Sequence, residues 1–190
     1  MTLKICNIFP TFFPKVGGVE TSLFQLSNGL AKRYNGTRHY LLTQRFPGTR
    51  SYERYGLLEV FRLTMRPPVI NVRLMGGGLQ LLNKLVFNIL GYYKAMSFTR
   101  DVDVFIAHNF DDVYITYKLA KHFKKPWIMY FHGRIGKQVG DVNPKFYENP
   151  LLKHSALMLV NRKSSFLHLK REFGEKVVLL PPYVDTEWFQ

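Results

Sequence analysis

Cysteine is nearly missing from this sequence, and so is any pattern typical of a secreted protein. Cys6 is the only cysteine among the 190 residues, so no disulfide can form within the chain. A single thiol in an apolar segment is typical of a small buried side chain in a reducing compartment. The residues from Met1 to Pro10 have neither the apolar run nor the cleavage pattern of a signal peptide. We therefore expect a cytoplasmic protein.

Long hydrophobic runs are also lacking. A membrane-spanning helix needs about 20 mainly apolar residues. The most apolar stretch, from Leu79 to Met96, is interrupted by Gln80, Asn83, Lys84, Asn88, Gly91 and Lys94. We expect that the chain does not cross a membrane.

Acidic residues are scarce relative to basic ones. The sequence has 13 Asp and Glu against 27 Lys and Arg, which gives a formal net charge of +14. Such an excess attracts nucleic acid, sugar phosphates or acidic lipid headgroups. Zinc-finger spacing, RNA-binding aromatic motifs and basic-zipper heptads are not found, so we expect no nucleic-acid partner. A basic nucleic-acid-binding domain is the weakest of the alternatives.

An anionic membrane surface is an open alternative for the basic excess. The apolar stretch from Val69 to Phe98 contains or adjoins several basic residues, a mixture suited to the interface of an anionic bilayer. Binding there, at the inner face of the cell membrane, would give access to a lipid-linked acceptor. The other interpretation is a buried helix with solvated basic ends. The basic residues are Arg62, Arg66, Arg73, Lys84, Lys94 and Arg100.

Short apolar runs alternate with helix-length segments along the whole chain. This alternation is typical of βαβ units, and nearly unbroken apolar runs predict central strands covered on both faces. We predict an α/β fold: one Rossmann-like three-layer domain over residues 1–180, with a mostly parallel sheet of about seven strands. The predicted strands are Leu3 to Phe9, Tyr40 to Thr43, Leu57 to Leu63, Val102 to Ala107, Trp127 to Phe131, Leu157 to Val160 and Val177 to Leu180.

Four helices are predicted between these strands. The first begins near Val19 and ends before Asn35-Gly36, because Val19, Leu23, Leu26 and Leu30 recur at helical spacing. The others are expected at Leu79 to Phe98, Asp111 to Lys125 and Ser164 to Phe173, the last closed by Gly174.

A glycine pair lies between the first predicted strand and the first helix. Gly17 and Gly18 allow the backbone to turn sharply and to approach a ligand, and the helix N-terminus after them favours a phosphate or carboxylate. The segment is neither a dinucleotide fingerprint nor a P-loop, so neither cofactor class is predicted. A plain tight turn is the alternative interpretation.

Two histidines each end a predicted strand, where ligands bind in parallel α/β folds. His132 follows Phe131 and precedes Gly133, and His108 is followed by Asn109. Either imidazole is suited to a substrate hydroxyl, although a hydrogen bond to a neighbouring carbonyl would explain each equally. No third ligand is spaced to complete a metal site with them, so no metal is predicted.

Taken in order, several segments resemble the retaining glycosyltransferases with a GT-B fold, in particular glycosyltransferase family 4. They are a Pro-x-x-Gly-Gly-x-Glu loop ending at Glu20, an Asp-Val-x-x-x-His strand from Asp103, a strand ending Phe-His-Gly at Gly133, and a closing Leu-Pro-Pro-Tyr-Val-Asp from Leu180. The chain is thereby identified as the N-terminal, acceptor-side half of such an enzyme.

The resemblance implies a role for each matching residue. Gly17, Gly18 and Glu20 would form the donor-binding loop against a sugar nucleotide, and His132 would be the catalytic residue beside the transferred sugar. His108, Asn109 and Gly133 would contact the acceptor or the sugar. Retention in this family is attributed to front-face attack assisted by the leaving phosphate, so the acceptor, a saccharide or a lipid-linked molecule, needs no protein nucleophile. No cofactor is implied.

The end of the sequence departs from the family pattern. The family usually has Pro-Asn-Gly-Val-Asp where this chain has Pro181, Pro182, Tyr183, Val184 and Asp185. We expect residues 181–190 to begin the interdomain linker, with Pro182, Tyr183 and Asp185 as the hinge. The C-terminal domain is absent from the sequence, so the chain alone should be inactive and should need that domain in cis or in trans. A non-catalytic binding domain that works with a separate catalytic subunit is the alternative function.

Overall fold

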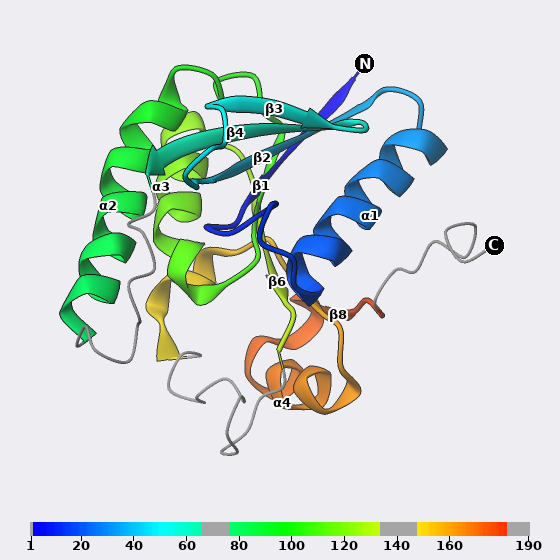
Figure 1. The fold of residues 1–190 in the computed structure, drawn as a ribbon. Helices are drawn as coiled ribbons and strands as arrows, with labels where there is room; N and C mark the ends of the chain where they lie inside the picture. Colours follow the sequence, from blue (N-terminus) through cyan, green and yellow to red (C-terminus); the bar gives the residue numbers. More distant parts are fainter. Residues whose placement is uncertain (1, 66–76, 134–147, 182–190) are drawn as a thin grey trace.

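The computed structural model describes residues 2–65, 77–133 and 148–181. In these residues strands and helices alternate as the sequence predicts, except that β2, β3 and β4 follow one another without a helix (Figure 1). The strands are β1 (Leu3–Ile8), β2 (Thr37–Arg45), β3 (Tyr52–Tyr55), β4 (Leu58–Met65), β5 (Val104–Ala107), β6 (Trp127–Phe131), β7 (Leu157–Val160) and β8 (Val177–Leu179). The α-helices are α1 (Gly18–Arg33), α2 (Gly77–Met96), α3 (Val113–Phe123) and α4 (Lys163–Phe173), and short 3-10 helices span Phe110–Asp112, Pro150–His154 and Gly174–Lys176.

All eight strands form one sheet in the order β3-β4-β2-β1-β5-β6-β7-β8. Every neighbouring pair is parallel except β3 and β4. The predicted Rossmann-like fold with a mostly parallel sheet is therefore confirmed. From β1 the chain adds β2 and β4 toward one edge of the sheet, and then β5 to β8 toward the other edge. The carboxyl ends of β1 and β5 therefore lie at the point where the strand order switches, which is where folds of this kind bind ligands.

The edge strand β3 is not among the predicted strands. Its sequence, Tyr-Glu-Arg-Tyr, has little apolar content, and it pairs antiparallel with β4 through a turn at Gly56, whose φ is 60°. Asn28 of α1 supports this turn by accepting from the Leu57 amide at 2.6 Å. Tertiary contacts, and not local hydrophobic pattern, therefore make this strand.

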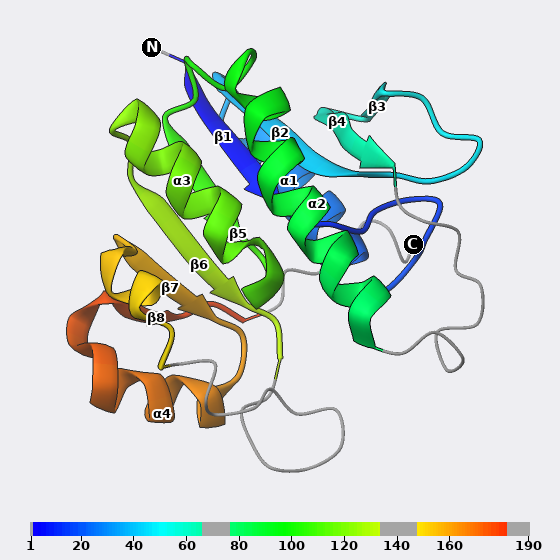
Figure 2. The ribbon, with the colours of Figure 1, turned by 90° about the vertical axis from the view of Figure 1, so that its left-hand side faces the viewer.

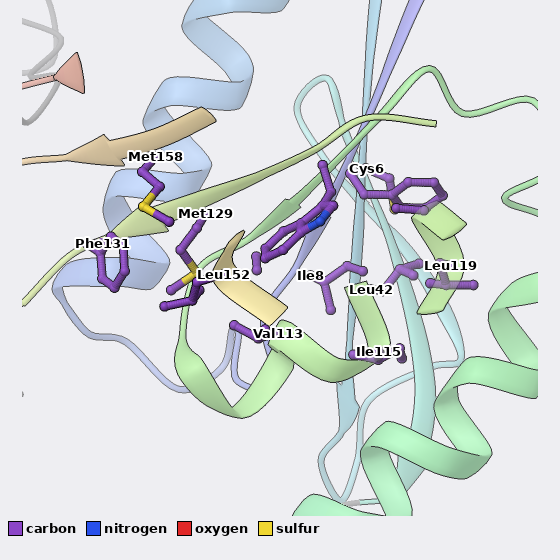
Figure 3. Close-up of a cluster of buried hydrophobic side chains, with 14 of the residues drawn as sticks. Cys6, Ile8, Leu42, Val113, Ile115, Leu119, Met129, Phe131, Leu152 and Met158 are labelled. Atoms are coloured by element: carbon purple, nitrogen blue, oxygen red, sulfur yellow. The ribbon is translucent and has the colours of Figure 1, made fainter. Parts of the chain in front are cut away.

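Helices cover both faces of the sheet, which gives the three predicted layers. Helix α1 lies on one face and packs a small apolar cluster with Phe12, Leu41 and Leu58. Helices α2, α3 and α4 lie on the other face, where α2 and α3 pack side by side and α4 lies below them in the view of Figure 2, against β7 and β8. The larger core cluster lies under them, and Figure 3 shows part of it, from Cys6 and Ile8 to Met129 and Leu152.

Helix α2 differs from the buried interpretation of its sequence. Phe87, Gly91 and Ala95 are buried on its inner side, and a Cβ at Gly91 would lie 3.2 Å from Ile115 Cδ1 of α3. The apolar residues on its outer side are exposed, because an outer-layer helix has only one side to pack. Burial of the whole helix was the wrong interpretation. The exposed residues are Leu81, Leu82, Leu85, Ile89, Leu90 and Tyr93.

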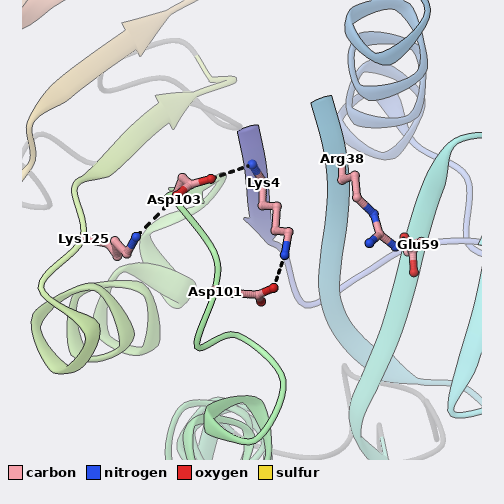
Figure 4. Close-up of polar contacts among 6 residues, drawn as sticks. All are labelled: Lys4, Arg38, Glu59, Asp101, Asp103 and Lys125. Carbon is pink, nitrogen blue, oxygen red and sulfur yellow. Dashed lines mark hydrogen bonds and ion pairs between the residues drawn. The ribbon is translucent and has the colours of Figure 1, made fainter. Parts of the chain in front are cut away.

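Charge pairs join the amino ends of the neighbouring strands β1, β5 and β6 (Figure 4). Asp103 accepts from the backbone amide of Lys4 at 2.9 Å and pairs with Lys125 at 3.4 Å. The hydrogen bond from the Lys4 amide is the main cause that lowers the pKa of Asp103. The aspartate of the Asp-Val-x-x-x-His segment therefore sets the start of β5, far along that strand from His108.

Candidate functional site

Two cavities adjoin at the ends of β1 and β5, where Phe9 and Asn109 line both. The larger has a volume of about 470 Å³ and is lined mainly by polar side chains, among them Glu20, Gln44 and Asn83. The smaller, of about 220 Å³, is lined by Val19, His108 and His132 together with apolar side chains. The helix start after the glycine pair and both strand-end histidines therefore lie around one cavity.

Gly17 and Gly18 have different surroundings in the loop before α1. Gly17 is the N-cap, with an extended backbone, and a Cβ there would lie 2.6 Å from Glu20 Oε2. A Cβ on Gly18 would meet nothing within 4 Å among the described residues. A side chain at Gly17 would therefore have to displace the Glu20 carboxylate, whereas the space beside Gly18 is open to a ligand.

Glu20 is buried and faces the larger cavity. Its Oε1 accepts a 2.8 Å hydrogen bond from the Thr11 hydroxyl, so the carboxylate joins the first turn of α1 to the loop after β1. This bond holds the side chain against Gly17, which explains why these residue types occur three positions apart. Its predicted role in the donor-binding loop stays a prediction, and the contact seen here is with the loop itself.

Arg62 anchors the same loop from β4, which corrects its assignment to a basic membrane surface. Its side chain is buried, pairs with Glu53 at 2.6 Å, and donates to the carbonyl oxygens of Phe13 at 2.6 Å and Gln44 at 3.3 Å. An arginine inside the predicted strand Leu57 to Leu63 was the available signal, since a charged side chain that is buried there must be paired.

The two strand-end histidines belong to one hydrogen-bonded chain. Nδ1 of His108 lies 2.8 Å from Nε2 of His132, and Nε2 of His108 lies 2.9 Å from Oδ1 of Asn7. Asn7 in turn donates from Nδ2 to the Tyr40 carbonyl at 3.3 Å. Sequence reasoning missed Asn7, although a lone amide inside the apolar strand from Leu3 to Ile8 pointed to a buried polar partner.

This chain fixes which nitrogen of each ring carries a proton. The bond to Tyr40 uses the amide nitrogen of Asn7, so its oxygen faces His108, whose Nε2 must donate. A neutral His108 then accepts at Nδ1, and His132 donates from Nε2. The remaining nitrogen of His132, Nδ1, is left with a lone pair and acts as a hydrogen-bond acceptor or base.

Burial keeps both rings neutral. It lowers the pKa of His132 to about 4, and it lowers the pKa of His108 well below its ordinary value, with the neighbouring His132 as a second cause. Tyr130 lies against His132, with 4.0 Å between the ring centroids. At neutral pH the pair therefore carries no charge, as the proton assignment above requires.

Asn109 and Asp112 hold the segment after β5. The side chain of Asn109 accepts from the Phe110 amide at 2.8 Å, and Asp112 accepts from the amides of His108 at 3.2 Å and Asn109 at 2.8 Å. Burial raises the pKa of Asp112 well above its ordinary value, although these backbone bonds oppose the shift. Asn109 thus reaches both cavities from a capped turn.

The remaining predicted site residues are Gly133 and the three residues of the hinge. The Gly133 carbonyl accepts from Ser165 at 3.3 Å, and the His132 carbonyl accepts from Asn161 at 3.2 Å, so α4 and the end of β7 support the turn after β6. Pro182, Tyr183 and Asp185, the predicted hinge, lie outside the described residues. Within the described ranges no group of three His, Cys, Asp or Glu side chains is placed to hold a metal ion.

The arrangement combines an open helix start, a neutral imidazole with a free acceptor nitrogen, and a polar cavity next to both. It is suited to a ligand with a phosphate at one end and hydroxyl groups at the other. No helix in the described part of the chain has the length and hydropathy that a membrane span requires.

Comparisons with known proteins identify the family of the chain. The family model of Glycosyltransferase Family 4 matches residues 16–188. Among curated proteins no significant match is found.

Solved structures share the fold at low sequence identity. Sucrose-phosphate synthase from Thermosynechococcus elongatus matches with a TM-score of 0.73 and 13% identity, over 97% of this chain and 49% of that chain. Anabaena HepE (Alr3699) in complex with UDP-glucose gives 0.64 and 12%, over 97% and 45%. A glycosyltransferase from Rickettsia africae gives 0.56 and 16%, over 100% and 45%. The chain thus spans about half the length of these proteins.

Proposed function

Because the chain belongs to Glycosyltransferase Family 4, we propose that it is the acceptor-side half of a retaining hexosyltransferase. The enzyme moves a sugar from a sugar nucleotide to a saccharide or lipid-linked acceptor. One observation carries the proposal: Val19, at the helix start beside the glycine pair, and His132 line the same cavity.

The smaller cavity is the proposed donor site. The backbone around Gly18 has open space for the diphosphate at the start of α1, where the helix dipole favours negative charge. The sugar would then face His132. HepE was solved with UDP-glucose, which supports a sugar nucleotide as the donor class.

His132 is proposed to accept a hydrogen bond from a sugar hydroxyl through Nδ1. Its ring is held by His108, and His108 is held by Asn7, so the direction of that hydrogen bond is set before the substrate arrives. A charged imidazolium would donate instead, and burial disfavours that form. His132 therefore positions the reacting sugar without forming a bond to it.

The transfer step needs no protein nucleophile. The acceptor oxygen bonds to the anomeric carbon on the face from which the diphosphate departs. The bond from that carbon to the diphosphate oxygen breaks with its electron pair on the diphosphate, which takes the acceptor proton. The protein contributes orientation and exclusion of water.

The larger cavity is the proposed acceptor site. Its polar lining offers amides from Gln44 and Asn83, a carboxylate from Asp111 and an ammonium from Lys15. Gln44 and Asn83 are joined by a 2.8 Å hydrogen bond, so β2 and α2 present a fixed pair of amide groups. Donors and acceptors in this density suit the hydroxyls of a saccharide.

A second domain is part of the proposal. In a two-domain enzyme the donor binds between the domains, so this chain would supply only one wall of the donor site. That domain could be supplied in cis or in trans. The single, buried Cys6 supports a reducing compartment, so we place the reaction in the cytoplasm, at the inner face of the cell membrane where the acceptor is lipid-linked.

Donor turnover tests the proposal. UDP-glucose and other sugar nucleotides are incubated with the chain alone, with a C-terminal Family 4 domain alone, and with both together or fused. Turnover that needs both parts and is lost in His132→Ala is expected. Robust turnover by the chain alone would contradict the need for a second domain. If neither the mixed nor the fused domains bound any sugar nucleotide, the donor class would be wrong.

A further inference from the structure

The outer side of α2 presents six apolar side chains to solvent. We call this surface the α2 outer face, and it consists of Leu81, Leu82, Leu85, Ile89, Leu90 and Tyr93. Each of the six is between 47% and 67% exposed. Single exposed apolar residues are ordinary, but a contiguous stripe of this kind marks an interaction surface.

The α2 outer face is separate from the protein core. Phe87, Gly91 and Ala95 occupy the opposite side of the helix and pack toward β4 and α3. From Leu81 to Tyr93 the stripe runs for about 18 Å along the helix axis. Figure 2 shows that α2 is the outer layer here, so no described element covers the stripe.

The charged side chains carried by α2 and α3 themselves are all basic. Neither α2 nor α3 contains an acidic residue, and between them they carry Lys84, Lys94, Lys118 and Lys121. Lys118 Nζ lies 5.9 Å from the ring centroids of both Tyr92 and Tyr114, which places a cation and two amphipathic rings at the border with α3. Leucine and isoleucine between tyrosine and lysine are typical of a helix lying in a bilayer interface.

We propose that the α2 outer face binds an anionic lipid bilayer. The apolar side chains enter the region below the headgroups, and Lys94 and Lys118 face the anionic headgroups. The structure revises the set of cations suggested by sequence alone, because Arg62 is buried against Glu53 and Lys84 pairs with Asp111 at 2.8 Å. The proposal does not depend on glycosyl transfer.

Charge and position favour a bilayer over a protein partner. A second copy docked on this face would bring lysines against lysines in a chain with a net charge of +14, which repels. Helix α2 connects the parallel strands β4 and β5, so it begins near the carboxyl ends of the strands and runs toward their amino ends. A second domain at the carboxyl ends would therefore reach only the first turns of α2. Tyr93 and Lys94 lie at the other end of the helix.

The same helix joins this surface to the proposed acceptor site. Asn83, Lys84 and Phe87 of α2 line the larger cavity, within two turns of Leu85 and Ile89. A chain seated through α2 would hold that cavity beside the headgroups, where a lipid-linked acceptor presents its polar end.

Vesicle sedimentation of the full chain tests the proposal. Vesicles of equal parts phosphatidylglycerol and phosphatidylcholine should bind the chain, with salt-sensitive binding, and pure phosphatidylcholine should bind it much less. Leu85→Gln with Ile89→Gln should lower the partition coefficient roughly 30-fold. Leu167→Gln on α4, where Leu167 is 52% exposed, is the matched control and should change it by less than about twofold.

A charge variant separates the two contributions. Lys94→Gln with Lys118→Gln should weaken binding to anionic vesicles by on the order of tenfold and leave binding to neutral vesicles unchanged. The thermal unfolding midpoint checks that each variant is folded, and Leu81→Gln with Leu82→Gln replaces the Leu85 and Ile89 double variant if that variant is not.

Three results would overturn the proposal. They are equal lack of binding to both vesicle types, wild-type binding by the Leu85 and Ile89 double variant, and a dimer in light scattering that this variant dissociates. The last result would assign the face to a second copy. Donor turnover is measured separately, so loss of vesicle binding leaves the proposed reaction intact.

Discussion

His108 Nδ1 and His132 Nε2 lie 2.8 Å apart, and the partner behind His108 is the amide of Asn7 and not a carboxylate. A carboxylate would stabilise an imidazolium, whereas an amide oxygen favours a neutral ring with a defined tautomer. The site is therefore built to hold a hydrogen-bond acceptor beside the proposed sugar position and not to supply a charged acid.

Asn7→Leu should remove that definition of the tautomer. With no acceptor at position 7, His108 can protonate at Nδ1, and His132 then loses its fixed acceptor nitrogen. We expect kcat of the two-domain enzyme to fall about tenfold with a smaller change in KM. Nitrogen NMR of the labelled imidazoles should show an unprotonated Nδ1 on wild-type His132 and a mixture in the variant.

Asn7→Asp is the complementary variant, because it retains an oxygen acceptor but adds the carboxylate that stabilises an imidazolium and should therefore raise the pKa of His108. It should keep His108 protonated at Nε2. A wild-type His132 that is protonated at Nδ1 would refute the assignment, whatever the activities.

The glycine pair predicts opposite outcomes for two similar substitutions. Gly17→Ala places Cβ against the Glu20 carboxylate and should break its bond to Thr11, at a cost of about 1 kcal/mol in the free energy of unfolding. Gly18→Ala meets open space and should leave stability within about 0.5 kcal/mol. Its methyl group should instead raise the KM for the donor.

Urea unfolding and donor kinetics separate these two effects. If Gly18→Ala lost stability while Gly17→Ala did not, the placement of the loop would be wrong. If neither changed the donor KM, the diphosphate would bind elsewhere.

Arg62→Met should destabilise the fold by about 3 kcal/mol, because it leaves Glu53 and the Phe13 carbonyl without their partner. Arg38→Met is the control. Arg38 pairs with Glu59 at 2.7 Å, but its side chain is 52% exposed, so its loss should cost less than about 1 kcal/mol. Denaturant unfolding midpoints would contradict this account if the two variants were equally stable.

His39 should give the stability a pH dependence on the acid side. Its ring is buried, neither ring nitrogen has a partner among the described residues, and burial lowers its pKa from 6.5 to about 4. Between these values the unfolded chain binds a proton that the folded chain does not. The free energy of unfolding therefore falls as pH is lowered from 6.5 toward 4.

His39→Phe isolates this contribution, since His132 acts in the same direction and Asp112 in the opposite one. The variant should lose up to about 1.4 kcal/mol per pH unit of the wild-type slope within that window. It should be at least as stable at pH 7. Identical slopes for both proteins would show that His39 is not buried in neutral form.

The sequence predicted the elements whose pattern is local and missed those made by distant contacts. The runs Leu3 to Phe9 and Trp127 to Phe131 are strands because apolar residues fill them, and Gly174, at φ 64°, closes α4 as predicted. Strand β3 needs β4 as its partner, and no local signal marks it. Periodicity alone also could not tell which side of α2 would be covered.

The site divides in the same way. Position at strand ends brought His108 and His132 into one prediction, and the structure places them in contact. Asn7 and Asp112 are joined to His108 across 101 and 4 residues of sequence, and Arg62 is joined to Phe13 across 49, through bonds that a single sequence does not encode as a motif. Their buried polar or charged nature was visible, but their partners were not.

The central claim is that the cavity between the start of α1 and His132 binds a sugar nucleotide. Titration of the labelled chain with UDP-glucose, followed by backbone amide and imidazole NMR, tests it most directly. The account predicts that the first resonances to shift are those of Gly18, Val19, His132 and Gly133. Shifts confined to other parts of the sheet, or none at the highest soluble concentration, would contradict it.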